Sequence, residues 1–318
     1  MLLDSRSYYK PFEYLWAYEA WKKQQEMFWM SHEINMSEDI LDWKYKLSNS
    51  ERNLLTQIFR FFTQADLDVL SGYTSKYPAL FQKPEIRMML TAFANMETIH
   101  VDAYSVLIDT LSLPESEYAS FLKYEEMNAK HEYLKQFSTN SPLDIAKTLA
   151  VYGAFTEGLQ LFSSFAILLN FPRNGKLKGM GQIVSLSVRD EHLHTTSIIR
   201  LFNIFVSEYK LRSKELTDFI TLACKEIVAN EDRFIDISFG DCDIQELKKD
   251  DVKKYIRYVA DVRLKQLGVS VIYNIDKNPL PWVSDMINTQ EHANFFETTP
   301  TEYAKSTSTT GDWSDVRY

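Results

Sequence analysis

The segment ANMETIHVDAY (residues 94–104) decides the fold of this chain, because it places a carboxylate and an imidazole three positions apart in an apolar stretch. A second segment, SVRDEHLH (residues 187–194), repeats this spacing. Positions i and i+3 share one face of an α-helix, so each carboxylate points the same way as its imidazole. Two such pairs and two further carboxylates, facing one another in a helical bundle, form a dinuclear metal site. The two pairs are Glu97 with His100 and Glu191 with His194.

A lone acidic residue precedes each pair by about thirty positions. Asp66 follows the apolar segment IFRFFTQA, and Glu157 lies within VYGAFTEGLQLF. A carboxylate in such surroundings is costly unless it is paired or bound to a metal. A buried salt bridge or a position at the helix rim remains an alternative for both residues, and Asp68 competes with Asp66. The predicted ligands form two half-sites of similar spacing: Asp66, Glu97 and His100, then Glu157, Glu191 and His194.

This ligand set is rich in oxygen, which favours iron(II) or manganese(II) over zinc in a thiolate cage. We expect two iron ions per chain, with manganese as the alternative. His192 points away from His194 on a helix, and we predict that it is not a ligand. We expect the remaining histidines to lie at the surface, since none has an acidic partner at helical spacing: His32, His131 and His292.

The composition excludes several other classes of protein. The chain has 318 residues, 45% of them hydrophobic, which suffices for a large core. A net charge of −9 disfavours electrostatic binding to nucleic acid. Two cysteines without a Cys-x-x-Cys motif fit a reducing compartment and exclude a disulfide framework. With no signal-peptide pattern and no apolar run long enough to cross a bilayer, we predict a soluble, cytoplasmic protein without membrane or nucleic-acid partners.

Helix signals dominate, while alternating β patterns with hairpin turns are nearly absent. We therefore predict an all-α, ferritin-like helical bundle over residues 1–290 with the metal site in its core. Residues 291–318 are rich in Thr and Ser, and we predict a flexible tail. Capping and proline signals predict helices from Ser48 toward Leu70, from Pro84 to about Leu111, and over 142–170, 182–209, 214–239 and 244–267.

Together these segments resemble the small, radical-generating subunit of class I ribonucleotide reductase, from about Phe28 to the tail. ANMETIHVDAY and SVRDEHLH resemble the family's two Glu-x-x-His ligand helices, and FTEGLQLFSSF resembles the helix of the third glutamate. The resemblance implies that Tyr104, one turn after His100, carries the radical. It also implies a relay of electrons through Trp29 and Asp190 to His100, and through Tyr303 at the subunit interface. The alternatives are a core anchor for Trp29, an ordinary buried tyrosine for Tyr104 and a tail aromatic for Tyr303.

In this family the reduced metal pair reacts with oxygen, and the resulting radical passes to a large subunit that reduces ribonucleotides. The resemblance implies a large subunit docked by the C-terminal tail and a homodimer. The sequence leaves open whether the native metal is iron or manganese. It also leaves open whether the metals are activated by oxygen or by superoxide from a flavoprotein activator. Ser187 replaces a bulky aliphatic residue usual beside the radical tyrosine, so a metal-centred oxidant is an alternative. Two alternative functions also remain: a stand-alone ferritin-like oxidase or hydroxylase, and a ferritin-like iron store.

Overall fold

The computed structural model describes residues 1–123, 132–134, 136–242 and 244–286. Over these residues the chain is helical, and the only extended pairing is an isolated bridge between Ile244 and Leu247. The predicted all-α bundle is therefore confirmed. Among the same residues, no helix is both long and apolar enough to cross a membrane.

The α-helices are α1 (Leu15–Glu26), α2 (Ser37–Leu41), α3 (Asn49–Ser71), α4 (Tyr77–Leu80), α5 (Pro84–Thr110), α7 (Pro142–Leu149), α8 (Phe162–Arg173), α9 (Lys178–Glu208), α10 (Lys214–Phe239) and α11 (Lys249–Gln266). Three segments have the wider turn of a π-helix: η2 (Asp42–Lys46), η3 (Gly72–Lys76) and η6 (Ala150–Gln160). Short 3₁₀ turns occupy η1 (Ser31–Glu33), η4 (Glu115–Glu117) and η5 (Ser120–Lys123).

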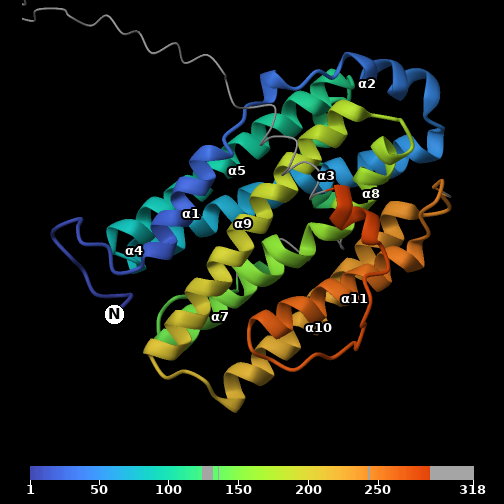
Figure 1. Ribbon diagram of the computed structural model, residues 1–318. Coiled ribbons are helices and arrows are strands. Elements are labelled where there is room, and N and C mark those ends of the chain that lie inside the picture. The colour runs from blue at the N-terminus through green and yellow to red at the C-terminus, as the bar shows by residue number, and fades with distance from the viewer. Residues whose placement is uncertain (124–131, 135, 243, 287–318) are drawn as a thin grey trace, which may run out of the picture.

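Long helices lie alongside one another and enclose the core (Figure 1). Helix α5 packs on α1, α3 and α9, while α10 and α11 pair on the opposite flank. The continuous helical stretch of η6 and α8 contacts both α9 and α11, so it lies between the two flanks. Every residue of η6 is buried, which places this segment at the centre of the bundle.

The local signals in the sequence identify several helix starts. The Ser48 hydroxyl accepts a hydrogen bond from the Glu51 amide at 3.1 Å, and the Glu51 carboxylate accepts one from the Ser48 amide at 2.7 Å. This is the predicted capping box at the start of α3. Pro84 opens α5, and α10 spans the predicted range.

Other boundaries differ from the prediction, and the causes are tertiary contacts. Helix α9 begins at Lys178, four residues early, because the Asp39 carboxylate accepts hydrogen bonds from the amides of Gly179 and Met180 at 2.9 Å. Helix α11 begins at Lys249, after the turn closed by the isolated bridge. The helix predicted over 142–170 contains η6 and continues to Arg173, since a proline in the last turn removes only one ladder hydrogen bond.

Candidate metal centre

Four helical segments carry the six predicted ligands to one place in the core. Each of these side chains is at most 2% exposed. Asp66 comes from α3, Glu97 and His100 from α5, Glu157 from η6, and Glu191 and His194 from α9. The approach of η6 to α9 depends on Gly153, because a Cβ atom there would lie 2.1 Å from Ile198 Cγ2.

The six side chains form two overlapping groups of donor atoms. In the four-residue group, Asp66, Glu97, His100 and Glu191 each offer an atom within 4.8 Å of the others. In the three-residue group, Glu157, Glu191 and His194 do the same. Glu191 belongs to both groups, whereas the sequence suggested two separate half-sites.

Two carboxylates lie between the two imidazoles. Glu97 Oε2 lies 3.4 Å from His100 Nδ1, and Glu97 Oε1 lies 3.0 Å from His194 Nδ1. Glu191 faces the same two nitrogens, with Oε1 at 3.4 Å from His100 and Oε2 at 4.0 Å from His194. Each carboxylate thus presents one oxygen to each imidazole, as a carboxylate that bridges two metal ions does.

The donor atoms fit metal ions because, apart from their contacts with one another, they lack partners. These buried atoms make no hydrogen bond in the structure: Asp66 Oδ2, both Glu97 oxygens, His100 Nδ1, Glu191 Oε2 and His194 Nδ1. Leaving a buried polar atom unsatisfied costs about 1–3 kcal/mol. A pair of divalent cations would satisfy all of them at once, and the oxygen-rich donor set suits iron or manganese.

Both imidazoles turn Nδ1 inward and bind a neighbour through Nε2. His100 Nε2 lies 3.3 Å from Asp190 Oδ2, and His194 Nε2 lies 3.0 Å from Gln24 Oε1. Such outer contacts fix the orientation of a ligating histidine. Trp29 Nε1 donates to the same Asp190 oxygen at 2.8 Å, so Trp29, Asp190 and His100 form one hydrogen-bonded series.

Three residues at this site were not predicted from the sequence. Gln24 also contacts Asp190, with Nε2 at 3.4 Å from Oδ1, and Arg189 Nη2 lies 3.2 Å from the same oxygen. The Tyr73 hydroxyl donates to Glu157 Oε2 at 2.8 Å. A signal for Gln24 was available, because it continues the buried stripe of α1 formed by Trp16, Ala17 and Ala20.

Tyr104 is buried beside the four-residue group. Its phenol oxygen has no hydrogen-bond partner, and its ring stacks on Phe62 with centroids 4.6 Å apart. Burial, together with the Asp66 carboxylate, raises the pKa of the phenol far above its ordinary value, so the phenol stays neutral. The Ser187 hydroxyl donates to the Ile183 carbonyl at 3.0 Å, and it also lies close enough to the phenol to oppose this rise of the pKa.

Of the remaining histidines, the structure describes only His32 and His192. His192 and His32 are exposed, as expected. His131, His292 and the tail residues 291–318, Tyr303 among them, lie outside the described residues.

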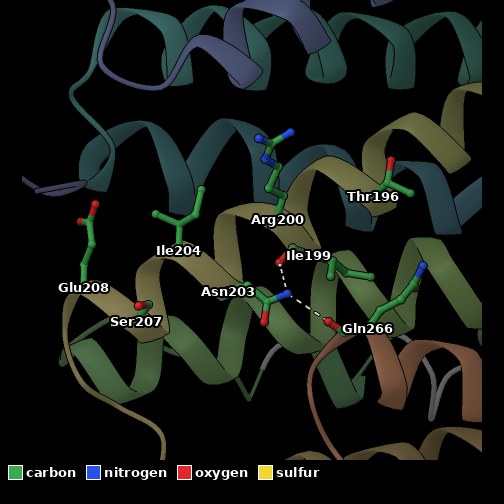
Figure 2. A pocket seen from close by; sticks show the side chains of 8 residues that line it. All are labelled: Thr196, Ile199, Arg200, Asn203, Ile204, Ser207, Glu208 and Gln266. Carbon is green, nitrogen blue, oxygen red and sulfur yellow. Dashed lines mark hydrogen bonds between the residues drawn. The ribbon is translucent and has the colours of Figure 1, made fainter.

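One cavity lies along α9 and another lies beside Tyr104. A groove of about 480 Å³ follows α9, where the Asn203 amide donates to the carbonyls of Ile199 and Gln266 (Figure 2). A second cavity, of about 280 Å³, is lined in part by Tyr104, Phe62 and Leu67. Neither cavity is lined by any of the six candidate ligands.

Crowding of carboxylates in the core shifts their protonation. Burial raises the pKa of Asp66 to about 8. Burial also raises the pKa of Glu157 and Glu191 well above the ordinary range, and repulsion from neighbouring carboxylates adds to the effect. Burial opposes ionisation of Glu97 as well, but the imidazoles of His100 and His194 hold its pKa low. At neutral pH the metal-free centre therefore keeps a proton on Asp66, and the raised pKa values of Glu157 and Glu191 favour protonation of these carboxylates as well.

We expect manganese(II) to bind more tightly as the pH rises from 6 to 8, because the metal must displace these protons. Below a pKa of about 8, the Asp66 proton alone weakens binding by about tenfold per pH unit. Titration of the metal-free protein with manganese(II), with free ion measured by electron paramagnetic resonance, gives the affinity. Proton release in weak buffer provides the control. An affinity that does not change over this range would contradict the protonated centre.

Comparison with known proteins places the chain in a family. Residues 6–279 match the family model "Ribonucleotide reductase, small chain". A protein of Invertebrate iridescent virus 3, named "Probable ribonucleoside-diphosphate reductase small subunit 048L", is 44% identical over 98% of this chain and 88% of its own length. A counterpart from Invertebrate iridescent virus 6 is 42% identical over 99% of this chain and 98% of its own length.

Solved structures agree on the fold. The ribonucleotide reductase R2 subunit from Clostridium botulinum has a TM-score of 0.81 at 21% identity, covering 86% of this chain and 89% of that one. Dimanganese(II)-NrdF from Streptococcus sanguinis has a TM-score of 0.74 at 23% identity, covering 89% of this chain and 99% of that one. The family match and the viral relatives lead to one conclusion: this chain belongs to the small-subunit family of ribonucleoside-diphosphate reductase.

Proposed function

We propose that this chain generates a radical on Tyr104 with a dinuclear metal centre and oxygen, and passes the oxidising equivalent to a large subunit that reduces ribonucleotides. One observation carries the proposal. The buried carboxylate and histidine cluster has Tyr104 near Asp66 and the Trp29–Asp190 contact at His100. An oxidant formed in the cluster would thus have both a place of storage and a route outward.

The metal pair is proposed to be iron or manganese, held by the six residues of the two groups. When bound, such ions supply one-electron oxidation chemistry after reaction with oxygen. The Streptococcus sanguinis relative is described as a dimanganese(II) protein, which supports manganese as one candidate. The oxygen-rich donor set suits either metal.

The storage role of Tyr104 is supported by its surroundings. The phenol lies among aromatic rings, since Phe62 stacks on it and Phe165 packs on Phe62 at 5.6 Å between centroids. Because Tyr104 is only 2% exposed, a phenoxyl radical there would have little contact with solvent outside the small cavity that it lines. Ser187, where the family usually has a bulky aliphatic residue, is the one departure that favours an oxidant held on the metals. Electron paramagnetic resonance distinguishes a radical on Tyr104 from such a metal-centred oxidant.

The relay role rests on the two short contacts of Asp190. One carboxylate oxygen accepts from the Trp29 indole at 2.8 Å and lies 3.3 Å from His100 Nε2. Burial opposes ionisation, but hydrogen bonding to His100 and the charge of Arg189 hold the pKa of Asp190 low. An anionic Asp190 can accept the indole proton as the electron leaves Trp29. Phe28 is exposed while Trp29 is buried, so the two do not form one core anchor.

A Trp29→Phe chain is expected to lose ribonucleotide reduction by about a hundredfold or more, because a phenyl ring offers no N–H to Asp190 and is much harder to oxidise. Metal content should stay at the wild-type level. The assay combines reductase turnover, measured with the large subunit, and metal analysis. Trp43→Phe is the matched control, since Trp43 is also buried but packs against Phe59. Normal turnover in Trp29→Phe would remove this residue from the relay.

The remaining proposals concern partners. We propose that residues 291–318 dock the large subunit, that Tyr303 continues the relay there, and that the chain forms a homodimer in the cytoplasm. A flavoprotein activator is the added requirement if superoxide rather than oxygen is used. A stand-alone oxidase needs an open path to its metals, and within the part of the chain that the structure describes the two cavities above do not supply one. The proposed radical on Tyr104 is tested by electron paramagnetic resonance of the iron-loaded and the manganese-loaded protein after exposure to oxygen.

A further inference from the structure

Tyr73 has a buried phenol next to the three-residue group. The proposed radical chemistry assigns no role to this phenol. It lies in η3, directly after α3. Its hydroxyl donates to Glu157 Oε2 at 2.8 Å. Its ring meets the His194 ring edge-on, with centroids 5.9 Å apart. Tyr73 therefore contacts two of the three members of this group, and neither contact is evident from sequence spacing.

The position of Tyr73 is fixed by close packing of two π-helical segments. A Cβ atom on Gly72 would lie 2.9 Å from Tyr152 Cδ1, so only glycine lets η3 approach η6 this closely. The Tyr73 ring is further held edge-on by Phe93 at 6.0 Å and Tyr77 at 5.9 Å between centroids. A ring clamped on three sides has little freedom to withdraw its hydroxyl from Glu157.

The backbone beside Glu157 is also held. Arg263 Nε donates to the Gly158 carbonyl at 2.8 Å, which anchors η6 to α11 immediately after the ligand. With its backbone fixed in this way, Glu157 can change its approach to a metal only by rotating its side chain. The hydrogen bond from Tyr73 opposes that rotation, because it occupies one of the two carboxylate oxygens.

We propose that Tyr73 is a positioning residue of the metal centre, which holds one oxygen of Glu157 and so fixes how this ligand binds the ion of the three-residue group. This inference rests on the proposed metal centre. The two buried tyrosines then have different tasks. Tyr104 has a phenol without a hydrogen-bond partner, whereas the phenol of Tyr73 is committed to a ligand. Removing such an outer contact typically weakens metal binding by about 10–100-fold.

Tyr77 provides a matched control. It is a buried tyrosine in the same cluster, but its hydroxyl makes no hydrogen bond. The full-length wild type, Tyr73→Phe and Tyr77→Phe would each be titrated with cobalt(II), with visible absorption reporting coordination and a competing chelator giving both dissociation constants. We expect two ions in every chain. In Tyr73→Phe alone, the absorption of one ion should change and its dissociation constant should rise about tenfold or more.

The possible results separate this inference from the metal centre itself. Superimposable spectra and equal constants for Tyr73→Phe and wild type would overturn the role of Tyr73 but leave the metal centre intact. A wild-type chain that binds no cobalt(II) or manganese(II) would overturn both. A crystal structure of the manganese-loaded wild type serves if Tyr73→Phe does not fold. A phenol oxygen more than about 3.5 Å from both Glu157 oxygens in that structure would also reject the proposal.

Discussion

A Tyr104→Phe chain should bind two metal ions like the wild type, yet show no organic radical after exposure to oxygen. Turnover with the large subunit should fall by about a thousandfold or more, because a catalytic unit that loses one member loses most of its effect. The physical reason is that the phenol is the proposed oxidisable group beside Asp66, and a phenyl ring cannot lose a phenolic proton with its electron. Electron paramagnetic resonance and a reductase assay on the same sample measure both consequences.

The substitution should leave the fold intact. The Tyr104 hydroxyl makes no hydrogen bond, so its removal breaks none, and the stacking on Phe62 remains. Tyr255→Phe is the control, since Tyr255 is a buried tyrosine of α11. Activity that survives in Tyr104→Phe together with a metal-centred signal would show that the oxidant is stored on the metals. In that case the departure at Ser187 would be part of the mechanism.

The sequence predicted the architecture well because its signals are local. A capping box, a proline at the first helical position and apolar residues at helical spacing are each defined by residues close together in the sequence. Helices α3, α5 and α10 begin where these signals lie. It failed where a distant side chain sets the boundary. The first turn of α9 is capped by Asp39, about 140 residues earlier, and no pattern within α9 announces this contact.

The site shows the same division. The spacing of Glu97 with His100 and of Glu191 with His194 is a helical property, so these residues could be paired from the sequence. The shared position of Glu191 depends on how four helical segments meet, and spacing alone suggested separate half-sites. Tyr73 and Gln24 enter the site through packing of η3 and α1. The buried stripe of α1 could have indicated Gln24, whereas a single tyrosine in a helix carries no distinctive pattern.

Because Glu191 belongs to both groups, Glu191→Gln should impair the binding of both metal ions. The amide cannot carry the negative charge that a bridging ligand supplies. Loss of an outer contact to a ligand already lowers metal affinity by about 10–100-fold. We therefore expect loss of this ligand to lower the metal affinity by more than about a hundredfold and the metal content from two ions per chain to less than one. Asp66→Asn, which alters only the four-residue group, should weaken one ion and leave the other nearly unchanged.

The metal-free chain distinguishes a binding defect from misfolding. Burial raises the pKa of Glu191 well above the ordinary range, which favours the neutral carboxyl group in the metal-free wild type. Glutamine is also neutral and of similar shape, and the thermal midpoint of the metal-free variant should therefore match that of the wild type. His192→Gln, at the exposed neighbouring position, should bind both ions. If Glu191→Gln retained two tightly bound ions, Glu191 would not be the ligand that joins the two groups.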